Sequence, residues 1–284
     1  MEIQPVSDEF GAIVKDVDLA NLSGDDFVHI EKAWWKYAVL LFPNQHLTTE
    51  EHLSFSNRFG RLECGLRRST TPSIGRIANI DKDGNLLPID HLGRRFSIGN
   101  SVWHSDSSYK CVGAKASLLL AQVVPEKGGE TEWADMRAAH DQLPQSMKDW
   151  LQEKTAVHNY SFSHAWHGGL EMLSEEDRKD LPPVEHPLIK VHPDSNRKVL
   201  FVGRHASHII GEDFFESRKL LRRLTQDATI SENTWRHKWQ VDDLVIWDNR
   251  CVLHRARWFP ADQPRAMVRS TVAGDGDNPW AVAN

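Results

Sequence analysis

The pattern of hydrophobic and polar positions near the start of the chain predicts two helices and a buried strand. Ser23 precedes an acidic turn, as a helix cap does, and the apolar residues that follow recur at helical spacing, which predicts a helix over residues 24–37. The apolar run 38–42 predicts a buried strand. Thr48 and Glu51 have the spacing of a capping box, so we expect a second helix that runs towards Phe59 and ends at Gly60.

The rest of the chain is dominated by short apolar runs between turn residues. These runs predict strands at 75–81, 116–124, 187–192, 198–203, 238–241, 244–247 and 266–273. Two helical patterns interrupt them, one at 135–151 that Pro144 should divide and one at 212–225. The second pattern has an apolar stripe that should face the core: Phe214, Phe215, Leu220, Leu221 and Leu224. Many short strands with helical cover predict a mainly β protein, a sandwich or a barrel.

Residues 82–100 lack any steady periodicity. They contain Gly84, Pro88 and Gly93, and the segment is long for a simple connection, so we expect a functional loop or lid there. No internal repeat or shift in composition marks a boundary between domains. We therefore expect a single domain over residues 1–284.

Composition and charge exclude several classes of partner. Lys and Arg total 34 against 40 Asp and Glu, a net charge of −6, so we expect no nucleic acid and no membrane partner. The longest apolar run, 116–124, is far shorter than the roughly 20 residues of a membrane span. The acidic N-terminus is unlike a secretory signal, and three cysteines cannot form a disulfide framework. We expect a cytoplasmic homo-oligomer that acts on a small molecule.

Histidine is unusually frequent, at 15 residues, and the motif His-x-Asp occurs twice. On a strand, residues i and i+2 point to one face and can reach a single metal ion. His192-Pro193-Asp194 lies between two strand-like runs and is rich in turn residues, which predicts a hairpin turn. His104 and Asp106 follow a strand-like stretch instead. They are therefore the better metal-ligand candidates.

A transition metal needs a third ligand, and His254 is the candidate because it follows the strand-like run 244–247. Two histidines and one carboxylate would leave open positions on the metal. The alternative for any single buried histidine is a structural role. Arg265 and Arg269 have even spacing on a strand, so both guanidinium groups should share one face, where they suit carboxylates. The alternative is a pair of exposed, salt-bridging arginines on an edge strand.

Four segments resemble the iron(II)- and 2-oxoglutarate-dependent dioxygenases of the taurine and 2,4-dichlorophenoxyacetate dioxygenase group. They are Trp103–Ser108, Gly128–Ala139, Trp247–Arg250 leading to His254, and Pro264–Thr271. Weaker similarity extends to both ends of the chain. The stretches Ala134–Ala139 and Asp248–Arg250 are more similar to the phenoxyacetate branch.

The resemblance implies a fold, a cofactor and a set of roles. The fold would be a double-stranded β-helix, a jelly-roll barrel, in which His104, Asp106 and His254 hold Fe(II). Arg265 would bind the distal carboxylate of 2-oxoglutarate, with the hydroxyl of Thr131 as a second contact. Arg269 and Asn100 would lie near the anionic head of the primary substrate.

The resemblance also implies a reaction with O2. A small carboxylate, in the preferred form an aryloxyalkanoate, would be hydroxylated at the carbon that bears the ether oxygen. The product would separate into a phenol and a 2-oxo acid, while 2-oxoglutarate gives succinate and CO2. Two alternatives remain open at this point: a taurine, sulfonate or alkyl sulfate dioxygenase, and a non-catalytic sensor of a metal or organic acid.

Five histidines in the middle of the chain have no role in this scheme: His158, His164, His167, His205 and His208. We expect them to be surface loop residues. The alternative is that one or two of them line the substrate pocket.

Overall fold

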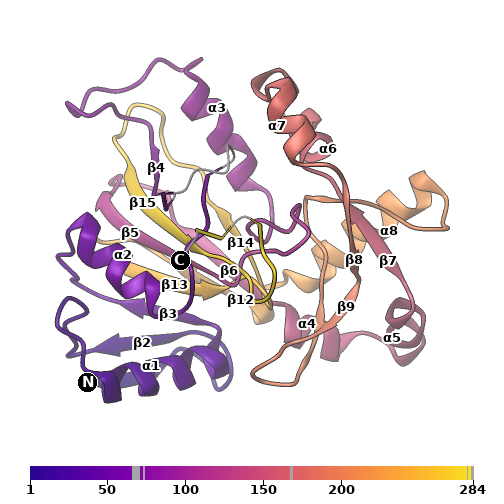
Figure 1. Ribbon diagram of the computed structural model, residues 1–284, viewed down its shortest axis with the longest axis horizontal. Helices are drawn as coiled ribbons and strands as arrows, with labels where there is room; N and C mark the ends of the chain where they lie inside the picture. The colour runs from indigo at the N-terminus through magenta and orange to yellow at the C-terminus, as the bar shows by residue number, and fades with distance from the viewer. Residues whose placement is uncertain (66–70, 73, 167–168, 280, 283–284) are drawn as a thin grey trace.

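A seven-stranded sheet forms the centre of the protein, with helices along its margins (Figure 1). The computed structural model describes residues 1–65, 71–72, 74–166, 169–279 and 281–282. Strands that are far apart in the sequence are neighbours in the sheet. Its order is β1 (Glu2–Pro5), β2 (Ala12–Lys15), β3 (Val39–Phe42), β13 (Leu244–Asp248), β5 (Ala116–Val123), β15 (Ala266–Val272) and β4 (Gly75–Ala78).

Three smaller sheets accompany the central one. Their strand orders are β12 (Thr234–His237), β6 (Thr131–Asp135) and β14 (Val252–Ala256); β11 (Ala206–Ile209), β7 (Thr155–His158) and β8 (Val184–Pro187); and the pair β10 (Lys198–Leu200) and β9 (Ile189–Val191). The α-helices in the described part of the chain are α1 (Gly24–Tyr37), α2 (Thr49–Asn57), α3 (Leu92–Ile98), α4 (Met136–Gln142), α5 (Gln145–Gln152), α6 (Tyr160–Ala165), α7 (Glu175–Asp180) and α8 (Phe214–Ala228). None of them combines the length and the apolar character of a membrane span.

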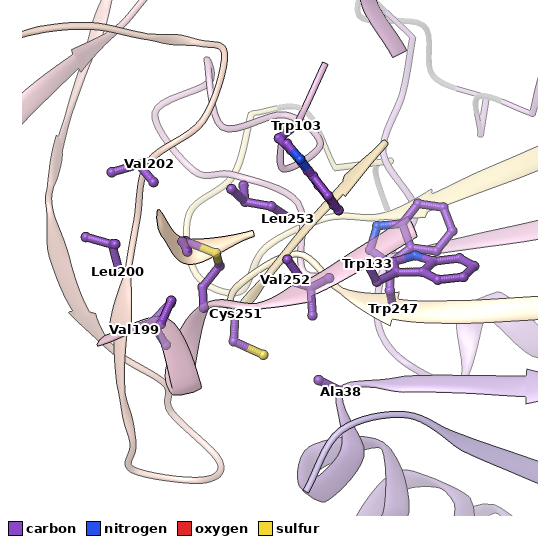
Figure 2. Packing of buried hydrophobic residues seen from close by; sticks show 14 of the residues in the cluster. Ala38, Trp103, Trp133, Val199, Leu200, Val202, Trp247, Cys251, Val252 and Leu253 are labelled. Atoms are coloured by element: carbon purple, nitrogen blue, oxygen red, sulfur yellow. The ribbon is translucent and has the colours of Figure 1, made fainter. Parts of the chain in front are cut away.

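The central sheet is buried on both faces. Along β13, Leu244 and Ile246 pack into a cluster with Trp34 of α1, whereas Val245 and Trp247 pack into a cluster on the other side. This alternation follows from the two-residue period of a strand. Figure 2 shows the second cluster, in which the rings of Trp247 and Trp133 lie 6.0 Å apart. The core therefore extends from the central sheet to β6, which precedes α4.

The predicted helix over 24–37 is confirmed as α1, because the Ser23 hydroxyl accepts a hydrogen bond from the backbone N–H of Asp26 at 3.0 Å. The capping box of Thr48 and Glu51 is confirmed at the start of α2, which ends at Asn57, before the predicted Gly60. Pro144 separates α4 from α5, as predicted. These elements carry their start and stop signals within a few residues of their ends.

Other predictions were wrong or incomplete. Residues 238–241 form no strand; β12 ends at His237, and the Asp243 carboxylate then accepts hydrogen bonds from the His237 ring and the Gln240 backbone, which closes a turn. Phe214 and Phe215 at the start of α8 are 43% and 77% exposed, while Leu221 and Leu224 are buried as predicted. The predicted strand 187–192 is divided between β8 and β9. The segment 82–100 contains α3 and part of the 3-10 helix 99–101, so it is not wholly irregular.

The buried imidazole of His52 makes the stability of the fold depend on pH. His52 lies on α2, hydrogen-bonds Ser270 of β15 at 2.8 Å, and has its pKa lowered by burial from 6.5 to about 4. The unfolded chain therefore binds a proton that the folded chain excludes, and stability should fall as pH decreases from 6.5 towards 4. The maximum loss is about 3 kcal/mol, at about 1.4 kcal/mol per pKa unit.

Urea unfolding at pH 7 and pH 5 measures this dependence. His52→Gln, which retains a polar partner for Ser270 but does not titrate, should unfold with a smaller difference between the two pH values. An identical difference in the wild type and the variant would contradict the role of His52.

Candidate metal centre and active site

His104, Asp106 and His254 converge in one buried cluster, as the sequence predicts. The Nε2 atoms of His104 and His254 lie 3.8 and 3.6 Å from the Asp106 carboxylate, and the three donor atoms lie within 4.8 Å of one another. His104 and His254 are paired by two backbone hydrogen bonds, of 3.1 and 2.8 Å. Asp106 lies in the turn that follows this single bridge, and Ser107 has a φ of 56°, so His104 and Asp106 do not share a continuous strand.

Neighbouring polar groups fix the orientation of the His104 and Asp106 side chains. His104 Nδ1 lies 2.8 Å from the carbonyl oxygen of Val102, so Nδ1 donates its proton there and Nε2 offers a lone pair towards the cluster. The Asp106 carboxylate accepts hydrogen bonds from the Ser117 hydroxyl at 2.7 Å and from the Arg269 guanidinium at 2.9 Å. The side chain of Asn249 accepts the Asp106 backbone N–H at 3.1 Å.

The charges in the cluster suit a divalent transition metal. Burial lowers the pKa of His104 well below its usual value and that of His254 to about 4, so both rings are neutral at pH 7. Burial alone would raise the pKa of Asp106, but Arg269 and the two histidines hold it below its usual value. Two imidazole nitrogens and one carboxylate on one side of a site are the donor set of open-faced iron centres. The residues present therefore fit Fe(II).

A cavity of about 250 Å³ adjoins the metal-ligand cluster. Besides His104 and Asp106 its lining includes Asn100, Tyr109, Tyr160, His164, Arg204, His205 and Arg269. Arg269 thus both pairs with Asp106 and faces the cavity. We call this space the metal cavity.

Arg265 lines a second, adjoining cavity of about 410 Å³, which shares Ile77, Ala78 and Asn100 with the metal cavity. Its side chain is almost fully buried. Among the residues that the structure describes, its Nε has no hydrogen-bond partner and Nη2 reaches only the carbonyl of Gly129, at 3.4 Å. Burial lowers the pKa of Arg265 to about 10, and no carboxylate among the described residues lines this cavity. A buried guanidinium of this kind requires an anion from outside the chain. The site therefore fits the distal carboxylate of 2-oxoglutarate.

Thr131 lies beside this second cavity. It is paired in register with Ala256, which lines the cavity, and its hydroxyl oxygen accepts the indole N–H of Trp239 at 3.0 Å. The hydroxyl proton of Thr131 consequently remains available for a ligand. The position is compatible with the role that the sequence predicts.

The mid-chain histidines differ from the expectation of surface loops. His158, His164 and His205 are buried, and the last two line the metal cavity; His167 lies outside the described residues. The sequence reasoning also missed Tyr109, Tyr160 and Arg204 as lining residues. Arg204 and His205 lie between β10 and β11, and no local pattern places that connection beside His104.

The second His-x-Asp motif is a turn between β9 and β10, as predicted, but its histidine is buried. His192 hydrogen-bonds Asp248 at 2.9 Å, and Arg250 donates to both oxygens of that carboxylate. Cys251 is close enough to complete a metal-ligand geometry with His192 and Asp248. Because Arg250 already neutralises Asp248, we interpret the cluster as a structural ion-pair network.

His192→Ala should separate this structural role from catalysis. We expect turnover within about twofold of wild type, and a loss of stability of about 1–3 kcal/mol because a buried hydrogen-bond partner of Asp248 is removed. Steady-state rates and urea unfolding of the same preparation measure the two effects. A large loss of metal binding would show that the motif is a ligand set after all.

The chain is similar to several known proteins over nearly its whole length. The model of the family described as "Taurine catabolism dioxygenase TauD, TfdA family" matches residues 2–271. The chain is 37% identical to the (S)-phenoxypropionate/alpha-ketoglutarate-dioxygenase of Sphingobium herbicidovorans over 100% of the chain and 98% of that relative. It is 39% identical to the alpha-ketoglutarate-dependent 2,4-dichlorophenoxyacetate dioxygenase of Cupriavidus pinatubonensis, with 95% and 97% coverage. Among solved structures, AAD-2 in complex with Mn(II) and N-oxalylglycine is similar, with a TM-score of 0.89, 37% identity and coverage of 100% and 98%.

Proposed function

The chain belongs to the TauD, TfdA family of dioxygenases, and from that premise we propose that its substrates are aryloxyalkanoates. It is an oxidoreductase that depends on Fe(II), 2-oxoglutarate and O2, as the sequence predicted. Membership of a dioxygenase family argues against the non-catalytic sensor.

In this proposal His104, Asp106 and His254 hold the metal, and Ser117 and Asn249 keep Asp106 in place. When bound, Fe(II) supplies open positions for the keto acid and for the activation of O2. Arg265 binds the distal carboxylate of 2-oxoglutarate, and the free hydroxyl proton of Thr131 is donated to the same group.

The head group of the primary substrate is proposed to lie between Arg204 and Arg269. Arg269 is already paired with Asp106, whereas Arg204 has no ion pair with a carboxylate among the described residues. A carboxylate in the metal cavity would give Arg204 its missing partner. This cation, close to the metal ligands, is the observation that carries the assignment of an anionic substrate.

The aromatic part of the substrate is proposed to pack against Tyr109 and Tyr160. Their ring centroids are 4.1 Å apart, and both rings line the metal cavity. Such rings offer an apolar and polarisable wall for an aryl group. Arg204 would then fix the carboxylate, and the tyrosines the ring, so that the carbon between them faces the metal ligands.

The reaction follows from that orientation. One oxygen atom of O2 enters succinate as 2-oxoglutarate loses CO2, and the other hydroxylates the carbon that bears the ether oxygen. The resulting hemiacetal breaks its bond to the ether oxygen and gives a phenol and a 2-oxo acid. The buried side chains of Tyr160, His164 and His205 at the cavity would limit the access of water to this step.

We further propose that residues 1–284 form one double-stranded β-helix domain, whose two faces are the central sheet and the sheet β12-β6-β14. Residues 82–100 are proposed as a lid, since Asn100 lines both cavities and Gly99 packs directly against the guanidinium of Arg204. A Cβ at position 99 would overlap Arg204, so closure of this segment and substrate binding would be coupled.

Two measurements test the proposed function. Oxygen exposure of the Fe(II) enzyme with 2-oxoglutarate and a panel of phenoxyacetates should release phenol and succinate in equal amounts. Succinate formation with taurine or an alkyl sulfate, without phenol from any phenoxyacetate, would instead favour the sulfonate or sulfate alternative.

Arg204→Gln tests the head-group assignment. We expect KM for the phenoxyacetate to rise by about 10- to 100-fold, the equivalent of a lost charge-assisted hydrogen bond, with little change in KM for 2-oxoglutarate. An unchanged KM for the phenoxyacetate would reject Arg204 as a substrate ligand.

A further inference from the structure

A pocket outside the active site lies between α6, α8 and the segment that leads to His104. Its volume is about 310 Å³. The lining consists of Val102, Trp103, Ser163, Trp166, Gly203, Arg204, Arg218, Leu221, Arg222, Thr225 and Gln226. A wider hollow on the surface of α8 shares Trp166, Arg218 and Arg222 with it. We call the first space the α8 pocket.

The α8 pocket combines an apolar wall with a flat aromatic surface. Trp103 and Leu221 are buried, whereas the indole of Trp166 is 56% exposed. The guanidinium of Arg222 lies over the Trp166 ring at 4.3 Å, and that of Arg218 lies 5.6 Å from it. Arg222 therefore lies on the Trp166 ring, while Arg218 is nearer to the Phe162 ring, at 4.9 Å.

The positive charges of this pocket lack negative partners. Among the described residues, Arg204, Arg218 and Arg222 form no ion pair with a carboxylate, and no acidic side chain lines the pocket. Arg218 Nη1 donates to the carbonyl oxygen of Ala206 at 2.6 Å, and its buried Nε has no partner in the described part of the chain.

The outer face of the same helix shows the contrast. Lys219 pairs with Glu216, and Arg223 pairs with Asp227. Arg218 and Arg222, at positions i and i+4, instead repel each other. Like charges held together in a partly buried pocket are stabilised when an anion binds between them.

We propose that the α8 pocket is a second binding site, specific for an organic anion with an aromatic body. Arg218 and Arg222 would bind the carboxylate, while Trp103, Leu221 and Trp166 would contact the ring. Arg204 lines both this pocket and the metal cavity, so the two sites share a wall. The choice of an aryl carboxylate as the ligand rests on the proposed function, whereas the site itself rests on the charges and rings of the pocket. The enzyme would thus hold a second substrate molecule next to the active site.

Calorimetric titration of the Fe(II) enzyme with phenoxyacetate, in the presence of 2-oxoglutarate and without oxygen, tests the proposal. We expect two binding events in the wild type. The double variant R218Q/R222Q should bind at the second site at least about tenfold more weakly, in line with the loss of charge-assisted hydrogen bonds. The single variant Arg222→Gln, which removes no hydrogen bond to the described residues, should weaken it in the same direction without a risk to folding.

The control variant is K219Q/R223Q, which removes the same charge from the same helix outside the α8 pocket. It should keep both binding events. Binding that is unchanged in R218Q/R222Q and Arg222→Gln, so that no event depends on these arginines, would overturn the proposal. An equal loss in K219Q/R223Q would also overturn it, because the effect would then be one of net charge.

The test of the α8 pocket and the test of the proposed reaction can fail independently of each other. Phenol release reports on the metal cavity, whereas the Arg222-dependent binding event reports on the α8 pocket. Binding without phenol release would reject the proposed reaction and retain the second site. Phenol release together with a single binding event that Arg222→Gln leaves unchanged would support the proposed reaction and reject the second site.

Discussion

Asp106→Ala is expected to abolish turnover. Removing a residue that only hydrogen-bonds to a metal ligand lowers activity or metal affinity by about 10- to 100-fold, and the loss of the ligand itself should be much larger. Asp106 supplies the only carboxylate of the donor set and lies within 3.8 Å of both histidine Nε2 atoms. Its removal leaves two neutral imidazoles and an unpaired Arg269 guanidinium beside them. A cation in that position opposes the binding of Fe(II), so the loss should occur at the metal-binding step.

Two measurements locate the defect. The visible charge-transfer band that forms anaerobically with Fe(II) and 2-oxoglutarate should be absent, and succinate should not form after exposure to oxygen. Asp194→Ala is the matched control, since it removes the aspartate of the other His-x-Asp motif, which pairs with Arg250. A normal band in Asp106→Ala, or its loss in Asp194→Ala, would contradict the assignment of ligands.

Ser117→Ala should fall between these variants. The Ser117 hydroxyl donates to one oxygen of Asp106 and accepts from the side chain of Asn249, so its loss frees the ligand without removing it. We expect the affinity for Fe(II) to fall by about 10- to 100-fold. A titration of the charge-transfer band with metal measures this change, and an unaltered affinity would show that Asp106 is positioned without the Ser117 hydroxyl.

Residues that cap or interrupt a helix were enough to predict where several helices begin and end. Ser23, Thr48 and Pro144 act on hydrogen bonds within their own helices, and each ends or begins a helix where the sequence predicts. Phe214 and Phe215 show the limit of such patterns. Their spacing fits the apolar stripe of α8, but the first turn of that helix extends past the surface that buries Leu221 and Leu224.

The metal ligands were predictable for a different reason. His104, Asp106 and His254 belong to short motifs whose chemistry is specific, although His104 and Asp106 lie at a single bridge and in a turn rather than along one strand. Tyr160, at the start of α6, and Arg204 and His205, between β10 and β11, line the same cavity. Because their positions depend on how distant segments pack, single-sequence patterns give no signal for them. Substrate selectivity is proposed to reside in this second group of residues.

Arg265→Ala and Arg269→Ala are expected to affect different ligands, although only four residues separate them. Arg265 lies in the second cavity with an unpartnered Nε, so its loss should raise KM for 2-oxoglutarate by about 10- to 100-fold and leave the affinity for Fe(II) alone unchanged. Arg269 donates to Asp106 and faces the metal cavity, so its loss should raise KM for the phenoxyacetate and also weaken Fe(II) binding.

The start of β15 explains the division, because Arg265 lies just before this strand and Arg269 lies within it. The register of β15 against β5 shifts between Ala266 and Met267. Arg265 lies before this irregularity in the chain, and Arg269 lies after it. The even spacing of Arg265 and Arg269 in the sequence therefore does not bring their guanidinium groups to one anion. Arg265 lines the second cavity, and Arg269 lines the metal cavity. Substrate, 2-oxoglutarate and metal titrations of the two variants separate the roles. An exchange of the two phenotypes, with Arg269→Ala impaired only towards 2-oxoglutarate, would refute the assignment of the cavities.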